Sequence, residues 1–266
     1  MRAALLLIGA TVCWSAPVPT WADYPLPHEL PRQDEFPDPL VMLDGIAVKS
    51  ADDWQNKRKP ELRSLFEHYM YGRYPAKPEQ VTAKVLFEWR NGPDGATLKE
   101  VELTFGPPEW PKIYLLIASP QGGKHPCFVG TNFGGNHLLT DNRHVRLPDA
   151  WMPDRYPGVV DHRATDVGRG AQSDSWPLEE IVRRGYAVAT FYCGDVQPDR
   201  SDEREGLRAV LSQAGDEADS AATATIMEWA WGIHRAVDHL QDEPAIDPKR
   251  IAVVGHSRLG KTALLA

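Results

Sequence analysis

The hydrophobic positions in the first half of the chain alternate with polar ones in two runs. Residues 81–90 carry an apolar side chain at every second position, and residues 100–105 repeat the pattern. Strict alternation is typical of a strand with one buried face. Because the segment 91–95 between the runs is rich in Gly and Pro, the pattern predicts an antiparallel hairpin, which the apolar run 113–118 extends by a third strand.

The pattern changes in the second half, where the apolar runs become continuous. Residues 127–130, 186–192 and 251–254 are short runs of this kind, typical of parallel strands that are covered on both faces. Apolar residues at helical spacing predict helices over 59–71 and 223–240. Antiparallel strands followed by strand–helix units predict an α/β fold with a mixed sheet.

Composition and charge narrow the class of protein. Hydrophobic residues make up 42% of the chain and charged residues 25%, the balance of a folded globular protein. The net charge of −8 gives no reason to expect nucleic acid as a partner, although it leaves room for a local basic pocket. The Pro-rich segment 23–50 predicts an irregular arm over the body of the fold. The long segment 131–184 predicts either a functional loop or short elements.

The N-terminus has the features of a secretory signal peptide. Arg2 precedes about ten apolar residues, and Thr20 and Ala22 supply small side chains before a cleavage site after Ala22. The alternative is an N-terminal buried strand. We expect residues 1–22 to be the signal and residues 23–266 to form a single domain of a secreted or periplasmic protein. No other stretch approaches the roughly 18 apolar residues of a membrane span.

The cysteines predict buried thiols. Cys13 leaves with the signal peptide. Cys127 and Cys193 stand at the beginning and the end of two predicted neighbouring parallel strands, too far apart for a disulfide.

One cluster of ligand-type side chains invites comparison with metal sites. It consists of His137, Asp141, His144, Asp161 and His162. Because the spacing matches no standard zinc pattern, we expect a solvated loop, no metal and no cofactor.

The candidate chemistry lies where the last apolar run meets a helix. Ser257 stands on that turn, within the sequence Gly255-His256-Ser257-Arg258-Leu259-Gly260-Lys261. Gly255 keeps one side of the turn free of Cβ atoms, and Gly260 is expected to let the helix pack close to the sheet. The general nucleophile-elbow pattern is G-x-S-x-G, but here the second glycine comes one residue late. The local sequence therefore leaves open both an elbow and a serine that caps a helix.

The wider sequence resembles a known family. The seven residues from Gly255 to Lys261 resemble the G-[CH]-S-R-x-G-K signature of the glucuronoyl esterases, carbohydrate esterase family 15, in which the late glycine is normal. The resemblance extends from about residue 40 to the end. Its other segments occur in the family's order: Asn132-Phe133-Gly134-Gly135-Asn136-His137, Trp176-Pro177-Leu178, Arg184 to Thr190, Trp229-Ala230-Trp231-Gly232 and Asp247-Pro248-Lys249-Arg250.

This resemblance implies an α/β-hydrolase fold with a mixed, mostly parallel sheet. It also implies hydrolysis of 4-O-methyl-glucuronoyl esters between glucuronoxylan and lignin alcohols, so that a plant cell-wall polysaccharide or lignin–carbohydrate ester is the expected partner. Ser257 matches the nucleophile that forms the acyl-enzyme, Arg258 the residue that stabilises the oxyanion, and Lys261 the residue that contacts the uronate hydroxyls. The alternative for both cations is a solvated first helical turn, but positive charge there opposes the helix dipole.

The loop Phe133, Gly134, Gly135 and Asn136 follows a predicted buried strand and resembles the loop that donates an oxyanion N–H in hydrolases. We expect it to line the site; the alternative is an ordinary glycine-rich turn.

The α/β-hydrolase order of triad residues is serine, acid, histidine. Nine residues follow Ser257, and they include neither an acid nor a histidine. The sequence therefore predicts a C-terminally truncated chain without the triad acid, the triad histidine or the last strands. We expect residues 23–266 alone to aggregate or stay partly unfolded, and to be inactive.

Three functions compete. The first is a glucuronoyl esterase, and the second an acetyl xylan or general carboxylesterase. The third is a non-catalytic hydrolase-fold module that binds carbohydrate. The intact Ser257-Arg258 pair argues against the third.

Overall fold

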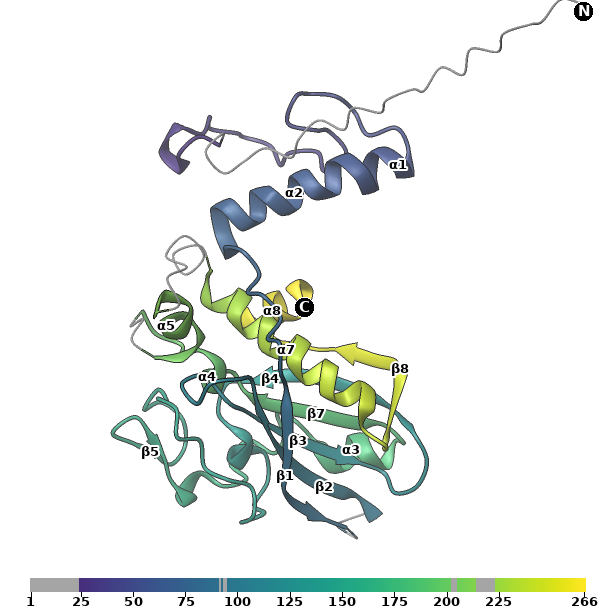
Figure 1. The fold of residues 1–266 in the computed structure, drawn as a ribbon, viewed down its shortest axis with the longest axis vertical. Coiled ribbons are helices and arrows are strands. Elements are labelled where there is room, and N and C mark those ends of the chain that lie inside the picture. Colours follow the sequence, from purple (N-terminus) through teal and green to yellow (C-terminus); the bar gives the residue numbers. More distant parts are fainter. Residues whose placement is uncertain (1–23, 91, 93–94, 202–204, 214–222) are drawn as a thin grey trace, which may run out of the picture. The chain divides into compact units, whose positions relative to one another are not determined.

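The structure is a computed structural model that describes residues 24–266 except 91, 93–94, 202–204 and 214–222 (Figure 1). The chain divides into two compact units, one ending at Met70 and the other running from Tyr71 to Ala266. The predicted signal peptide lies outside the described residues. The prediction of a single domain over 23–266 stays a prediction.

The first unit contains a helical segment that is longer than the sequence pattern predicted. It begins at Ala51, eight residues before the expected start, and consists of α1 (Ala51–Asp53), η3 (Trp54–Arg58), α2 (Lys59–Phe66) and η4 (Glu67–Tyr71). The missed signal is an N-cap, because the Ser50 hydroxyl accepts the Asp53 N–H at 3.0 Å. Before this helix the chain is irregular, as its prolines predict, apart from the short η2 (Pro27–Glu29).

The second unit is built on a six-stranded sheet with the order β1-β2-β3-β7-β4-β8 (Figure 1). All six predicted strands are present: β1 (Thr82–Trp89), β2 (Thr97–Thr104), β3 (Ile113–Ser119), β4 (His125–Asn132), β7 (Ala187–Tyr192) and β8 (Ile246–Val253). The sheet is mixed, as expected, but the prediction that it is mostly parallel is wrong for the described strands. Three of the five pairings are antiparallel, those of β1 with β2, β2 with β3 and β3 with β7, and the two parallel pairings are those of β4 with β7 and β8.

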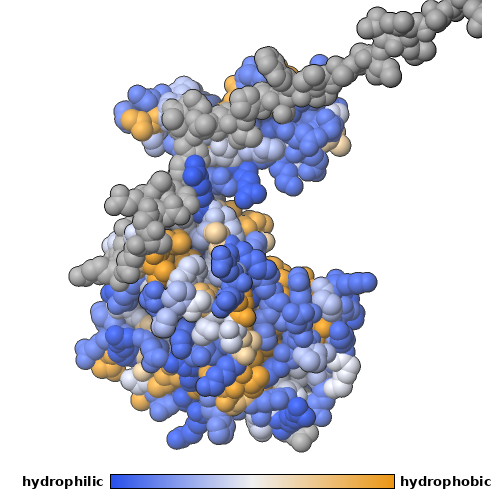
Figure 2. All heavy atoms as spheres, viewed as in Figure 1, coloured by the Kyte–Doolittle hydropathy of each residue, from blue (hydrophilic) through white to orange (hydrophobic). Residues whose placement is uncertain are grey.

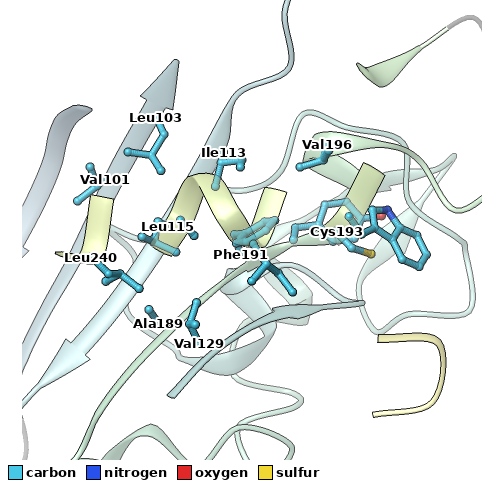
Figure 3. Close-up of a cluster of buried hydrophobic side chains, with 14 of the residues drawn as sticks. Val101, Leu103, Ile113, Leu115, Val129, Ala189, Phe191, Cys193, Val196 and Leu240 are labelled. Atoms are coloured by element: carbon cyan, nitrogen blue, oxygen red, sulfur yellow. The ribbon is translucent and has the colours of Figure 1, made fainter. Parts of the chain in front are cut away.

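Helices cover both faces of this sheet. On one face, α7 (Thr225–Asp242) packs on residues such as Leu115 and Val129, and Figure 3 shows these side chains gathered with Leu240 of α7. On the other face, α3 (Leu178–Arg183) packs on Leu116 and Val188. Neighbouring residues of one strand thus enter opposite cores, as the pleat requires.

The edge strand β1 departs from its predicted alternation. Val85 pairs with Val101 but Phe87 pairs with Glu100, so Leu86 is an extra, bulged residue. A one-residue insertion moves every later side chain to the opposite face. The apolar row therefore lies on the α7 face before the bulge and on the α3 face after it, where Phe87 packs beside Leu116.

Short elements fill the long connections. The segment 131–184 contains η6 (Asn136–Leu139), η7 (Asp166–Gly168), α3 and a small hairpin of β5 (Val159–Val160) and β6 (Arg163–Ala164). After β7 come α4 (Cys193–Val196) and α5 (Gly206–Gln213), and β8 leads to α8 (Arg258–Leu265).

The two remaining cysteines are as predicted. Cys127 lies in β4 and Cys193 follows β7, and both are buried free thiols.

The face of the second unit that Figure 2 shows is mainly hydrophilic, with hydrophobic residues in small groups. Charged residues interrupt even the 18-residue α7, and no helix in the described part of the chain is long and apolar enough to cross a membrane.

Candidate active site

Ser257 occupies the turn between β8 and α8 in a strained conformation. Its backbone has φ 56° and ψ −124°, a region that non-glycine residues rarely adopt. Ser257 stands at the N-cap position of α8, but its side chain makes no capping hydrogen bond. The residue is exposed to solvent. The strain therefore holds an accessible hydroxyl at a strand–helix turn, the geometry of a nucleophile elbow.

The two glycines of the motif differ in what they do. A Cβ on Gly255 would collide with the carbonyl oxygen of Leu259, so the turn requires glycine there. A Cβ on Gly260 would lie 3.4 Å from the carbonyl oxygen of Gly255, an ordinary van der Waals distance. A Cβ would therefore fit at Gly260, and the need for glycine there stays a prediction.

The loop after β4 is held by a buried asparagine. Asn132 Oδ1 accepts the N–H of Gly135 at 2.7 Å, and Asn132 Nδ2 donates to Asn136 Oδ1 at 3.0 Å and to Thr190 Oγ1 at 3.1 Å. Gly135 has φ 86°, and a Cβ there would lie 2.8 Å from Pro148 Cγ, so the loop also requires this glycine. Local hydrogen bonds thus set the shape of residues 133–136.

Asn136 connects this loop to the antiparallel part of the sheet. Its Nδ2 donates to the Tyr114 carbonyl at 2.7 Å and to Glu100 Oε1 at 3.3 Å. Glu100 is fully buried on β2, and its Oε2 accepts the N–H of Arg146 at 3.1 Å. Burial raises the pKa of the Glu100 carboxyl, while the N–H groups of Arg146 and Asn136 oppose the rise.

A cavity of about 680 Å³ brings the loop and the elbow together. Phe133 lines it from the loop, Gly255 and His256 line it from the elbow, and Tyr156 and Trp176 add aromatic surface. A pocket of this size and lining suits a small organic ligand. Of the four expected site-lining residues only Phe133 lines this cavity, whereas Gly134, Gly135 and Asn136 are buried and do not line it.

Arg258 has an acidic partner that the sequence did not reveal. Its Nη1 donates to Asp199 Oδ1 at 2.6 Å, and its guanidinium carbon lies 5.3 Å from the centre of the Phe133 ring. The other carboxylate oxygen of Asp199 lies 3.8 Å from Nη2 of Arg155. Asp199 comes from the segment after β7, which follows the carboxyl end of a parallel strand. Polar residues that follow parallel strands meet at one edge of a sheet. The position of Asp199 after a predicted strand could therefore have placed it near Ser257.

Lys261 lies one helical turn from the serine. Its backbone N–H donates to the Ser257 carbonyl at 3.2 Å, and its side chain is exposed. Within residues 24–266 and outside the gaps, the ammonium has no ion-pair partner. It is therefore available to a ligand that reaches the elbow.

The histidine cluster corrects one expectation. His137 is fully buried on η6, and its ring nitrogens lack hydrogen-bond partners among the described residues. Burial lowers the pKa of its imidazole to about 4. His137 is thus not part of a solvated loop, whereas Asp141, His144, Asp161 and His162 are exposed. The described residues contain no group of three or more side chains suited to hold a metal ion.

Comparisons with known proteins agree on one family. Residues 169–266 match the family model described as glucuronyl esterase of fungi. The carbohydrate esterase MZ0003, from an unknown prokaryotic organism, is 38% identical over 237 residues, which make up 87% of this chain and 55% of that protein. The solved structure of a promiscuous CE15 esterase from a marine bacterial metagenome is 36% identical with a TM-score of 0.76, covering 88% of this chain and 60% of that one. Over most of its length the chain is similar to members of carbohydrate esterase family 15.

A second solved structure of the family supports the fold. The glucuronoyl esterase from Solibacter usitatus is 30% identical with a TM-score of 0.77, over 89% of this chain and 61% of that one. The mixed sheet with helices on both faces is the α/β-hydrolase fold that the resemblance predicted. The chain spans about half the length of the curated family members it matches, 55% of MZ0003 and 48% of the 4-O-methyl-glucuronoyl methylesterase of Phanerochaete carnosa.

Proposed function

We propose that the whole protein, meaning the product of the complete reading frame that contains these 266 residues, is a serine esterase. It hydrolyses 4-O-methyl-glucuronoyl esters that join glucuronoxylan to lignin alcohols. The observation that carries the proposal is the strained, exposed Ser257 on a strand–helix turn beside an aromatic-lined cavity. The name of the Phanerochaete carnosa relative, which is 27% identical over 90% of this chain, supports the substrate class.

The residues divide the chemistry as follows. The Ser257 oxygen attacks the ester carbonyl and forms a tetrahedral intermediate, and its proton passes to a base. The guanidinium of Arg258 and backbone N–H groups at the start of α8 stabilise the oxyanion. The intermediate expels the alcohol, which takes up a proton, and leaves the glucuronoyl group on Ser257. Water then hydrolyses this acyl-enzyme. Lys261 contacts the uronate hydroxyls and takes no part in proton transfer.

Location and partners follow from the same proposal. Substrates of this kind occur in the plant cell wall, so the protein acts after export, either secreted or in the periplasm. The net charge of −8 of these 266 residues gives no reason to expect nucleic acid as a partner.

The direct test is hydrolysis of a methyl ester of 4-O-methyl-glucuronic acid by the whole protein. We expect turnover, and we expect Ser257→Ala to lower kcat by about 10⁴-fold or more, as loss of a serine nucleophile does. Ser212→Ala is the matched control, because Ser212 is an exposed serine on α5 whose hydroxyl donates to the Arg208 carbonyl. Turnover that survives Ser257→Ala would refute the proposal.

A simple aryl acetate measured alongside separates a glucuronoyl esterase from a general one. The marine metagenome relative is described as promiscuous, so we expect some turnover of the acetate. A higher kcat/KM for the acetate than for the glucuronate ester would favour a general carboxylesterase.

A further inference from the structure

The guanidinium of Arg258 has to be fixed before it can stabilise an oxyanion. Its side chain is 46% exposed and stands at the first position of α8, where the helix dipole disfavours positive charge. An arginine side chain also loses rotamer entropy when it is fixed in one position. Electrostatic stabilisation of a transition state requires donors that are already in place.

Two contacts from other elements provide this restraint. The Asp199 carboxylate, only 15% exposed, accepts a charge-assisted hydrogen bond of 2.6 Å from Nη1 of Arg258. The Phe133 ring packs against the same guanidinium at 5.3 Å. Within the described residues Nε and Nη2 of Arg258 have no partner, so those N–H groups stay available.

The backbone that carries Asp199 is itself anchored. The Gln197 carbonyl accepts the indole N–H of Trp229 at 2.8 Å, and Gln197 Oε1 accepts the N–H of Arg208 at 3.2 Å. Arg208 in turn makes two hydrogen bonds, of 2.9 and 3.1 Å, to the fully buried Glu228. The carboxylate is therefore presented from a segment that α5 and α7 hold in place.

The charges around Asp199 leave the site positive. The carboxylate faces Arg258 through one oxygen and Arg155 through the other, so two guanidinium charges surround one negative charge. Asp199 can orient Arg258 without cancelling the positive charge that an oxyanion needs. Without the carboxylate, two like charges would be left close together, and Arg258 would move away.

We propose that Asp199 is a positioning residue, which holds Arg258 through Nη1 so that its remaining N–H groups face the reacting ester at Ser257. This inference rests on the proposed function. It adds a residue that the local elbow motif does not contain and that acts only through Arg258.

The test is a double-mutant cycle in the whole protein, with Asp199→Asn and Arg258→Gln, assayed on the glucuronate ester. We expect Asp199→Asn to lower kcat by about 10- to 100-fold with little change in KM, because misplacing a catalytic group costs that much. In the Arg258→Gln background the same change should alter kcat by less than about twofold. Equal losses in both backgrounds, or no loss in either, would overturn the inference.

Two further variants make the result decisive. Asp247→Asn removes a comparable 2.6 Å pair with Arg250 in β8, and it should leave kcat unchanged. If Asp199→Asn fails to fold, Asp199→Glu keeps the charge with a longer side chain. That variant should lower kcat in the wild-type background alone, and a loss of the same size with Arg258→Gln would again overturn the inference. Failure of the proposed function looks different, because Ser257→Ala would then keep its activity.

Discussion

The antiparallel part of the sheet and its parallel part differ in how far apart in the sequence their paired strands lie. β1, β2 and β3 follow one another through short connections and pair as consecutive neighbours. β4, β7 and β8 are separated by the long segments 133–186 and 193–245, and their carboxyl ends meet at one edge. The candidate chemistry lies at that edge. Strands that are neighbours in the sequence therefore form the scaffold, whereas segments that are far apart in the sequence form the candidate site.

The largest effect on stability is expected in the antiparallel part. Leu103→Ala removes a fully buried side chain of β2 and should lower the free energy of unfolding by about 2–5 kcal/mol. Denaturant unfolding of the whole protein would measure the loss. Because Leu103 lies away from the elbow, kcat of the folded fraction should stay unchanged, and a large fall in kcat would break the division between scaffold and site.

Arg258→Lys tests the parallel edge, and here the effect should fall on chemistry. The change keeps the charge but removes the planar fork that binds Asp199 and that we propose binds the oxyanion, so kcat should fall by an amount worth about 2–4 kcal/mol. Steady-state kinetics on the glucuronate ester would show it, with thermal unfolding as the control for stability. An unchanged kcat would mean that Arg258 is only a charged surface residue with no role in the reaction.

His137, on η6 after β4, should affect the pH dependence of stability. Its folded-state pKa of about 4 is below the ordinary value of 6.5, so the unfolded chain binds the proton more tightly. Its contribution to stability is fully present above pH 6.5 and is lost as the pH falls towards 4. His137→Gln should therefore flatten the pH dependence of unfolding between these values by about 2–3 kcal/mol. The exposed His144→Gln is the control, and an equal effect there would contradict the account.

Lys261→Ala should have the smallest effect and should distinguish substrates. An exposed ammonium one turn from Ser257 suits the hydroxyls of a sugar acid, which an aryl acetate lacks. We expect kcat/KM for the glucuronate ester to fall about tenfold, the usual worth of one hydrogen bond to a charged group, with the acetate little affected. Similar losses on both substrates would favour a general esterase.

The antiparallel strands show how far local patterning reaches. Alternation located β1 and β2 to within three residues at either end, because every second side chain of a half-buried strand points to the core and is apolar. The same rule missed the bulge at Leu86, because an inserted residue looks like any other until a partner strand fixes the register. It also missed the start of the helix at Ala51, although Ser50 and Asp53 carry a capping signal.

Some features of the candidate site could also be predicted from the sequence, and others could not. The motif from Gly255 to Lys261 was enough to predict a strand–helix turn with Ser257 on it, since the glycine and the change of pattern lie side by side in the chain. The strained φ of Ser257 and the burial of His137 had no such signature, and for the pairing of Asp199 with Arg258 the only signal was the position of Asp199 after a parallel strand. They depend on which strands become neighbours and on what each segment then covers. The sequence alone determined most of the elements and the resemblance to a family, because these rest on patterns among neighbouring residues. Only the tertiary structure decided how residues from three distant segments meet, because that follows from the order of strands in the sheet.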